Sequence, residues 1–215
     1  MRRVAYAAAT VLTLLVGVVM VVRGQEQRVR LDRAGEIAVL GASISGAESA
    51  WPDRLGLTNQ SLSASRLLTD NGPGLPSALH RLDSAIRPGV RAVLLTDLIN
   101  DIQQEPHQYD PEIIIAGLRE FLRQAHRRGI QVIGTTITPY GGFLRYEPDG
   151  ERTRQAVNHF IRHSGEFDLV LDFDAAVRDA AAPERLRPEF DSGDHLHPNA
   201  AGQRRLAAVA TETLG

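Results

Sequence analysis

Side chains able to do nucleophilic and acid–base chemistry stand at two places far apart in the sequence. The segment 38–56, AVLGASISGAESAWPDRLG, carries Ser43 among small residues directly after an apolar run. The segment 191–199, DSGDHLHPN, holds two acids and two histidines: Asp191, Asp194, His195 and His197. A histidine that is oriented by an acid can deprotonate a serine for acyl transfer. These residues therefore predict a serine-based site or, from the acids and histidines alone, a Zn²⁺ or Mn²⁺ site.

Both segments also allow a purely structural interpretation. A serine in a tight turn is often a helix cap, and an aspartate in a loop commonly accepts hydrogen bonds from backbone amides. Asn100, in the segment LINDI, fits the serine-based site better than the metal site. Its side-chain amide could donate to the oxyanion of an acyl-transfer intermediate.

Composition excludes several other kinds of site. The chain has 215 residues, no cysteine and no lysine, so all 24 of its basic residues are arginine. Thiolate and Schiff-base catalysis, a Ser–Lys dyad and Cys-based metal sites are therefore excluded. The formal net charge is −2, and no run of basic residues marks a binding face for phosphates. We therefore expect no nucleic-acid partner.

The first 35 residues differ in kind from the rest of the chain. Residues 4–22, VAYAAATVLTLLVGVVMVV, carry no charge, and as a helix they would reach roughly 28 Å, close to the ~30 Å of a hydrocarbon core. We expect residues 1–23 to be a transmembrane anchor rather than a cleaved signal peptide, because the apolar run is long and VVRGQEQ is a poor cleavage site. Residues 24–35 are expected to be a linker, and the domain to be extracytoplasmic, or secreted where the anchor is cleaved.

Short apolar runs alternate with helical patterns along residues 36–215. Buried strands are predicted at 37–40, 91–96, 130–137 and 169–173, with a weaker strand near 57–62. Helices are predicted at 75–86, 111–129, 151–164 and 199–214. This alternation predicts an α/β fold, a three-layer α/β/α sandwich with a parallel sheet. Because ligands bind outside the carboxyl ends of such strands, the polar residues that follow each strand are expected to meet at one edge.

These segments together resemble the SGNH hydrolases, also called GDSL esterases and lipases. The resemblance covers nearly the whole domain and rests on LGASIS, NQSLSASRLL, LINDI and DSGDHLHPNAAG, in that order. Phrases such as WPDRL and FDLVLDFDAAVRD are similar to an exported bacterial branch of these enzymes. The resemblance implies a flavodoxin-like fold and hydrolysis of carboxylic esters of lipids, glycans or small molecules. It implies no cofactor and no metal ligand.

The resemblance also implies a role for each residue of the site. Ser43 would be the nucleophile, Asp194 the orienting acid and His197 the base, while His195 would be structural. The oxyanion donors would be the backbone amides of Ser43 and Ala64 and the side chain of Asn100.

Three residues depart from the family pattern: Ala42, Ala64 and Leu98. Ala42 replaces the aspartate of the Gly-Asp-Ser motif, so the turn loses a brace, and restoring an aspartate there is expected to raise turnover. Ala64 replaces an oxyanion glycine and keeps its amide donor only where the backbone accepts a Cβ. Leu98 replaces a glycine and is expected to narrow the pocket. A weakened, non-catalytic binding domain is therefore the alternative to an active esterase, and a metal-dependent hydrolase is a further one.

Overall fold

The structure is a computed structural model that describes residues 36–215. The transmembrane anchor predicted at residues 1–23 and the linker predicted at 24–35 lie outside the described residues. Among residues 36–215, no helix is long and apolar enough to cross a bilayer.

Five parallel strands form one sheet in the order β2-β1-β3-β4-β5. They are β1 (Glu36–Leu40), β2 (Thr58–Asn59), β3 (Val90–Leu95), β4 (Gln131–Thr135) and β5 (Leu169–Leu171). The strands β1 and β3 match their predicted runs to within one residue, β4 and β5 are shorter than their runs, and the weakest run gives the short edge strand β2. The strand order reverses between β1 and β3, which makes the carboxyl ends of these two strands the expected binding edge.

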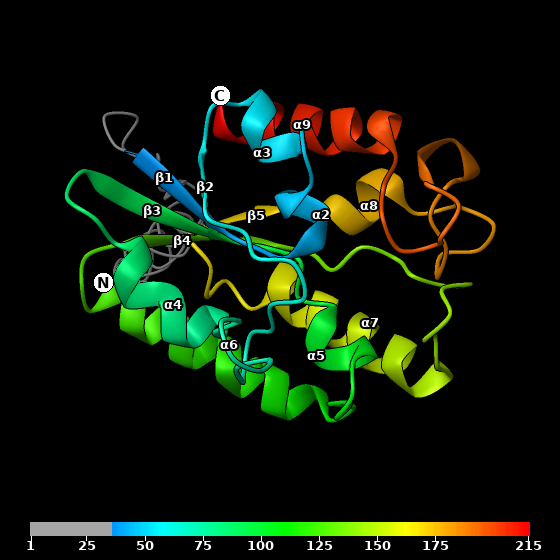
Figure 1. Cartoon of the computed structure of the whole chain (residues 1–215), viewed down its shortest axis with the longest axis horizontal. Helices are drawn as coiled ribbons and strands as arrows, with labels where there is room; N and C mark the ends of the chain where they lie inside the picture. The colour runs from blue at the N-terminus through cyan, green and yellow to red at the C-terminus, as the bar shows by residue number, and fades with distance from the viewer. Residues whose placement is uncertain (1–35) are drawn as a thin grey trace, which may run out of the picture. The chain divides into compact units, whose positions relative to one another are not determined.

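Helices cover both faces of the sheet (Figure 1). One face carries α4 (Ala78–Ala85), α6 (Pro111–His126) and α7 (Pro148–His163). The other carries α3 (Trp51–Arg54), α8 (Phe173–Val177) and α9 (Ala200–Leu214). The α/β fold with a parallel sheet that the sequence predicts is therefore confirmed.

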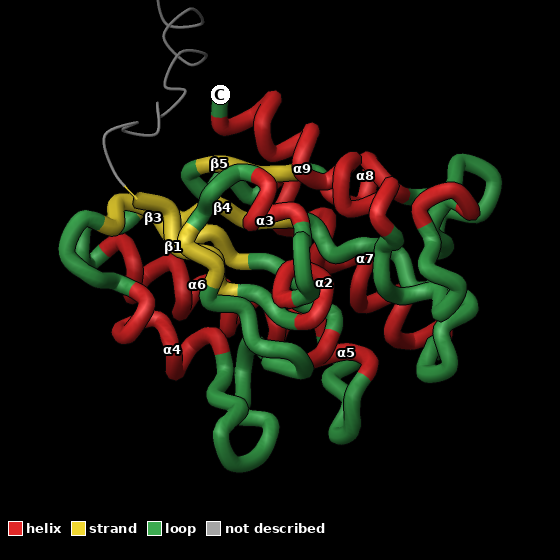
Figure 2. Tube along the Cα trace, turned by 45° about the horizontal axis from the view of Figure 1, so that its top comes forward, coloured by secondary structure: helices red, strands yellow, loops and turns green. Residues whose placement is uncertain are grey.

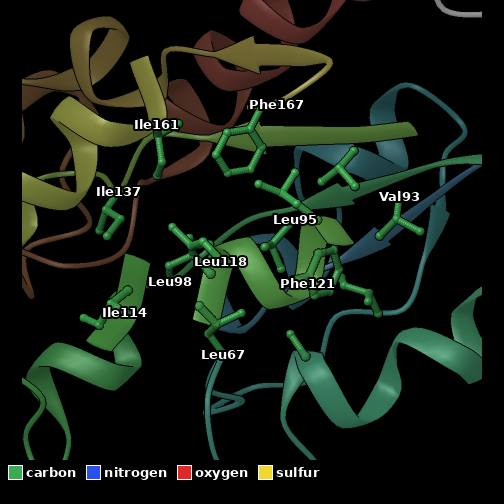
Figure 3. Packing of buried hydrophobic residues seen from close by; sticks show 14 of the residues in the cluster. Leu67, Val93, Leu95, Leu98, Ile114, Leu118, Phe121, Ile137, Ile161 and Phe167 are labelled. Carbon is green, nitrogen blue, oxygen red and sulfur yellow. The ribbon is translucent and has the colours of Figure 1, made fainter. Parts of the chain in front are cut away.

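The two faces of the sheet bury two separate apolar cores. Successive side chains of a strand point to opposite faces, so Val93 and Leu95 of β3 enter one core and Leu94 enters the other. Figure 3 shows Val93 and Leu95 beside Phe121 of α6 in the first core. In the second core Trp51 packs against α8 and α9. Because both faces are buried, the strands read as continuous apolar runs in the sequence.

Two helices begin away from their predicted positions for local reasons. The helix predicted to begin at residue 75 begins at Ala78, because the Ser77 hydroxyl accepts the backbone amide of His80 at 3.2 Å and caps it there. The helix predicted to begin at residue 151 begins at Pro148, since proline suits the first helical position.

Two short helices follow the carboxyl ends of the central strands. The helix α2 (Ser43–Gly46) comes after β1 and α5 (Asn100–Gln103) comes after β3, so both lie at the carboxyl end of the sheet (Figure 2). Gly41 joins β1 to α2 at a position with no space for a side chain. A Cβ there would lie 2.1 Å from Ser45 Oγ and 2.7 Å from Thr96 Cγ2. This close approach brings the turn after β1 against the end of β3.

Candidate active site

Ser43, His197 and Asp194 form a hydrogen-bonded chain at the carboxyl edge of the sheet. Ser43 is the first residue of α2, and His197 lies 154 positions further on, in the loop before α9. His197 Nε2 is 2.9 Å from Ser43 Oγ, and His197 Nδ1 is 2.5 Å from Asp194 Oδ2. The structure therefore brings together the three residues that the sequence singled out as nucleophile, base and acid.

Hydrogen bonds keep Asp194 in its ionised form. Burial alone would raise the pKa of Asp194, but the side chain and backbone amide of His197, the amide of Leu196 and the Ser192 hydroxyl outweigh it and hold that pKa below its ordinary value. An ionised Asp194 accepts the Nδ1–H of His197, which leaves Nε2 to accept the Ser43 hydroxyl proton. The imidazole is therefore in the tautomer that a general base requires.

The other acid and histidine of the 191–199 segment form a separate pair. His195 Nδ1 is 2.6 Å from Asp191 Oδ2, while Asp191 Oδ1 accepts the backbone amides of Gly193 at 2.8 Å and His195 at 3.0 Å. Within residues 36–215 no group of three or more acids and histidines is arranged to hold a metal ion. The pairing of each histidine with its own aspartate favours the serine-based interpretation of this segment over the metal interpretation.

The sequence predicts two backbone amides, those of Ser43 and Ala64, as oxyanion donors. Ala64 has a φ of 64°, a left-handed conformation that favours glycine, so the backbone does accept a Cβ at this position. No acceptor within residues 36–215 takes the Ala64 amide. The amide of Ser43 stands in the first turn of α2, where an N–H has no intrahelical partner.

Asn100 lies beside the loop that carries Ala64. Its side chain is 3% exposed, and its Nδ2 donates to the backbone carbonyl of Ser65 at 2.9 Å. Its Oδ1 accepts from Gln103 Nε2 at 2.7 Å, which fixes the orientation of the amide. A side-chain amide carries two N–H donors, so one remains after the bond to Ser65.

The expectation that Leu98 narrows the pocket is corrected by the structure. Leu98 is buried in the core on the α6 side of the sheet, where Figure 3 shows it beside Leu118. Burial in this core removes its apolar side chain from water, which is favourable. The side chain therefore contributes to packing below the site.

A carboxylate does support the turn around Ser43, but it comes from the end of β3 instead of position 42. Asp97 Oδ2 accepts the backbone amides of Ala42 at 2.9 Å and Ser45 at 2.8 Å, and it also accepts the Ser45 hydroxyl. The expectation that the loss of the family aspartate leaves this turn without a brace is therefore wrong. Asp97 has no local signal in the sequence, because its contacts join the segments that follow β3 and β1.

Arg81 of α4 connects the turn after β1 to the loop that carries Ala64. Arg81 is 8% exposed as a residue, and its Nη2 donates to the carbonyl of Gly41 at 3.2 Å and to Ser65 Oγ at 3.0 Å. Burial lowers the pKa of Arg81, and no carboxylate within residues 36–215 forms an ion pair with it. Its position on the apolar face of the helix, three residues after Ala78 and four before Ala85, is a signal that sequence analysis could have used.

Two further amides hold α2 from its other side. Gln203 of α9 donates to the carbonyl of Ile44 at 2.8 Å and accepts the amide of Trp51 at 2.9 Å. Asn59 of β2 donates to the carbonyl of Ser45 at 2.7 Å. The first turn of α2 is therefore fixed by side chains from α9 and from the neighbouring strand.

Comparisons with known proteins identify the family and the fold of the chain. Residues 23–205 match the model of the GDSL-like lipase/acylhydrolase family. A GDSL-like lipase from Bacteroides thetaiotaomicron has a similar structure, with a TM-score of 0.69 at 16% identity over 84% of this chain and 87% of that one. The psychrotrophic esterase EstA from Pseudoalteromonas sp. is similar at a TM-score of 0.59 and 16% identity, over 84% of this chain and 96% of that one.

At these identities the structural likeness shows the fold alone, and no curated protein sequence matches the chain. The family match is independent of that likeness and extends over most of the chain. The chain therefore belongs to the GDSL-like lipase/acylhydrolase family, and it is a carboxylic ester hydrolase.

Proposed function

We propose that this protein hydrolyses carboxylic esters through an acyl-enzyme intermediate on Ser43. The observation that carries the proposal is the continuous chain from Ser43 Oγ to His197 Nε2 and from His197 Nδ1 to Asp194 Oδ2, at 2.9 and 2.5 Å. A serine is a weak nucleophile unless an adjacent base takes its proton, and this arrangement supplies that base and its orienting acid.

The reaction proceeds in two halves. In the first, Ser43 Oγ attacks the ester carbonyl carbon while His197 Nε2 takes the hydroxyl proton, and the proton then passes to the departing alcohol as the C–O bond breaks. In the second, a water attacks the acyl-serine carbonyl and gives its proton to His197, which returns a proton to Ser43 as the carboxylic acid leaves. Asp194 stays ionised throughout and stabilises the imidazolium that forms twice in each cycle.

The tetrahedral oxyanion of each half is assigned to three donors. They are the backbone amides of Ser43 and Ala64 and the second side-chain N–H of Asn100. In support, no acceptor within residues 36–215 takes the Ala64 amide, and Asn100 uses one N–H for the Ser65 carbonyl. Pre-oriented donors of this kind stabilise charge that appears only in the transition state.

The substrate is proposed as an ester with a lipid, glycan or small-molecule alcohol and an acyl or acetyl group. The names of the similar proteins, a lipase and an esterase, support an ester but do not choose among these alcohols. A panel of p-nitrophenyl esters of rising acyl length, assayed on the full chain, ranks the acyl groups by kcat/KM.

The test of the mechanism is the Ser43→Ala variant. Turnover of the best ester is expected to disappear and labelling by a fluorophosphonate probe to be lost, with an unchanged thermal melt, because both reactions need the hydroxyl. Ser164→Ala, which alters a serine at the end of α7, is the matched control and should behave as the wild type.

Wild-type turnover in Ser43→Ala would overturn the assignment. A wild-type protein that neither takes the probe nor cleaves any ester of the panel would instead support the alternative of a non-catalytic binding domain with this fold.

A further inference from the structure

We propose that Asp97 is the positioning residue of the nucleophile, supplying from the end of β3 the carboxylate that the family motif carries at position 42. This inference rests on the proposed role of Ser43 and names a residue outside the triad and the oxyanion donors. It concerns how the turn holds Ser43 against His197.

The hydrogen bonds of Asp97 bracket Ser43 on both sides. Its Oδ2 accepts the amide of Ala42, directly before the nucleophile, at 2.9 Å, and the amide of Ser45, two residues after it, at 2.8 Å. The Ser45 hydroxyl donates to the same oxygen. A single anchor that holds the backbone before and after one residue limits the rotation of that residue's peptide groups, and so fixes where Ser43 Oγ points.

Asp97 is itself held firmly. Its side chain is buried, with the residue 9% exposed, and its Oδ1 accepts the Thr96 hydroxyl at 3.1 Å. Thr96 in turn accepts from the Thr135 hydroxyl of β4 at 2.9 Å. Asp97, which holds the turn after β1, is therefore connected through Thr96 to β4. The hydrogen-bond donors around its carboxylate compensate the cost of burying the charge.

Position 42 is complementary to this arrangement. Ala42 is 2% exposed, and its own amide is one of the donors to Asp97. An aspartate at position 42 would place a second carboxylate beside its own backbone amide, which already donates to Asp97. Two carboxylates competing for one set of donors repel each other, so Asp97 and the small side chain of Ala42 belong together.

This reasoning reverses the outcome expected from sequence for Ala42→Asp. In the wild-type background the substitution is expected to lower kcat, since it adds a like charge beside Asp97. In the Asp97→Ala background the same substitution is expected to raise kcat, because it returns a carboxylate to the amides that Asp97→Ala leaves without an acceptor. If the effect of Ala42→Asp on kcat changes sign with the residue at position 97, then a carboxylate at either of the two positions can hold the turn.

The experiment measures kcat, KM, the rate of fluorophosphonate labelling of Ser43 and the thermal melt of full-length variants. Asp97→Ala is expected to lower kcat and the labelling rate together by about 10²-fold, the usual effect of a displacement of about 1 Å at a reacting atom. Asp97→Asn keeps a neutral acceptor oxygen, so its loss should be smaller, and KM should change less than about twofold in both, as the substrate contacts are unaltered.

Asp168→Ala is the matched control. Asp168 is also a carboxylate that accepts a buried strand amide, that of Val132 at 2.7 Å, but it lies before β5, at the amino edge of the sheet. Its loss should lower the melting temperature and leave kcat and the labelling rate within about twofold of the wild type. A general loss of stability is thereby separated from a loss of positioning.

The decisive variant is the double substitution Ala42→Asp with Asp97→Ala. A kcat at least tenfold above that of Asp97→Ala supports the proposal, and no gain over Asp97→Ala overturns it. An Asp97→Ala protein within twofold of wild-type kcat, or one that changes KM alone, also overturns it. Where Asp97→Ala does not fold, a double variant that folds and turns over supports the proposal, and one that stays unfolded overturns it.

Failure of this inference is distinguishable from failure of the proposed function. If Ser43→Ala retains wild-type turnover, the acyl-serine mechanism fails. If Ser43→Ala is inactive while the Asp97 variants remain fast, the mechanism stands and only the role of Asp97 fails.

Discussion

His195 and His197 lie in the same short segment and each contacts an aspartate, but one of them also contacts Ser43. His197 and His195 each contact an aspartate through Nδ1, at 2.5 and 2.6 Å, but only His197 reaches Ser43 with its other nitrogen. We expect His197→Ala to lower kcat by about 10⁴-fold and His195→Ala by less than about tenfold. Steady-state kinetics on one ester checks this. Reversed losses would exchange their roles, and equal losses would favour a shared role such as metal binding.

Ala64 carries backbone strain that a glycine would relieve. An L-residue in the left-handed region costs about 1–2 kcal/mol, and glycine at position 64 would remove that cost. Part of this gain in stability is lost again, because glycine also makes the unfolded chain more flexible. Ala64→Gly is therefore expected to raise the free energy of unfolding by up to about 1 kcal/mol, with kcat within about twofold because the amide donor stays. Urea unfolding and ester assays measure the two quantities.

Ala207→Gly, in the middle of α9, is the control for this glycine substitution and should destabilise by about 1 kcal/mol. A destabilised Ala64→Gly protein would contradict the strain argument. A large fall in kcat would show that the Cβ of Ala64 helps to hold the donor loop.

The residues and their resemblance to a known family predicted the triad, but neither predicted its supports. Ser43, Asp194 and His197 stand in segments whose composition is unusual by itself. Asp97 and Arg81 look ordinary in sequence, and their importance depends on contacts with residues 42–45 and 41, respectively, which lie far from them along the chain. A hydrogen bond between residues far apart in the sequence leaves no periodic or local pattern, so it cannot be predicted from one sequence.

At the scale of elements, the long apolar helices and the strands were predicted and the short helices were not. The strands read as short continuous apolar runs, weakest at β2, and the helices α4, α6, α7 and α9 have clear apolar periodicity. The helices α2, α5 and α8 have four or five residues, too few to be stable alone, and exist because tertiary contacts hold them. These short helices carry Ser43 and Asn100, so the least predictable elements position the chemistry.

The contact between α9 and α2 gives a test at this scale. Gln203 satisfies the buried amide of Trp51 and the carbonyl of Ile44, so Gln203→Ala leaves two polar groups without partners and is expected to destabilise by about 2–4 kcal/mol. It should also lower kcat, because α2 loses its anchor. Gln155→Ala on α7, whose side-chain amide donates to Glu151 at 2.7 Å, should change neither quantity measurably.

Wild-type kcat in a destabilised Gln203→Ala protein would show that Asp97 and Asn59 alone suffice to hold α2. The kcat of Gln203→Ala therefore shows whether Asp97 and Asn59 hold α2 by themselves or whether α9 is also needed.

For the whole molecule, attachment to a membrane stays a prediction from sequence. The uncharged run 4–22 lies outside the described residues, and its length is what motivates the prediction. Full-length protein is expected to sediment with membranes and to stay there through a high-salt wash, because burial of apolar residues is not screened by salt. Recovery of a mature protein in the medium, beginning after residue 22, would show that the run is a cleaved signal.

The separation of Ser43 from His197 along the chain has a consequence for biosynthesis. The nucleophile emerges early from the ribosome, whereas its base follows 154 residues later and Gln203, which anchors α2, later still. A nascent or prematurely terminated polypeptide that ends before residue 197 thus holds a serine with no base, and it cannot attack esters while it is being made. Return of esterase signal during refolding would likewise report when the segment that carries His197 has docked against α2.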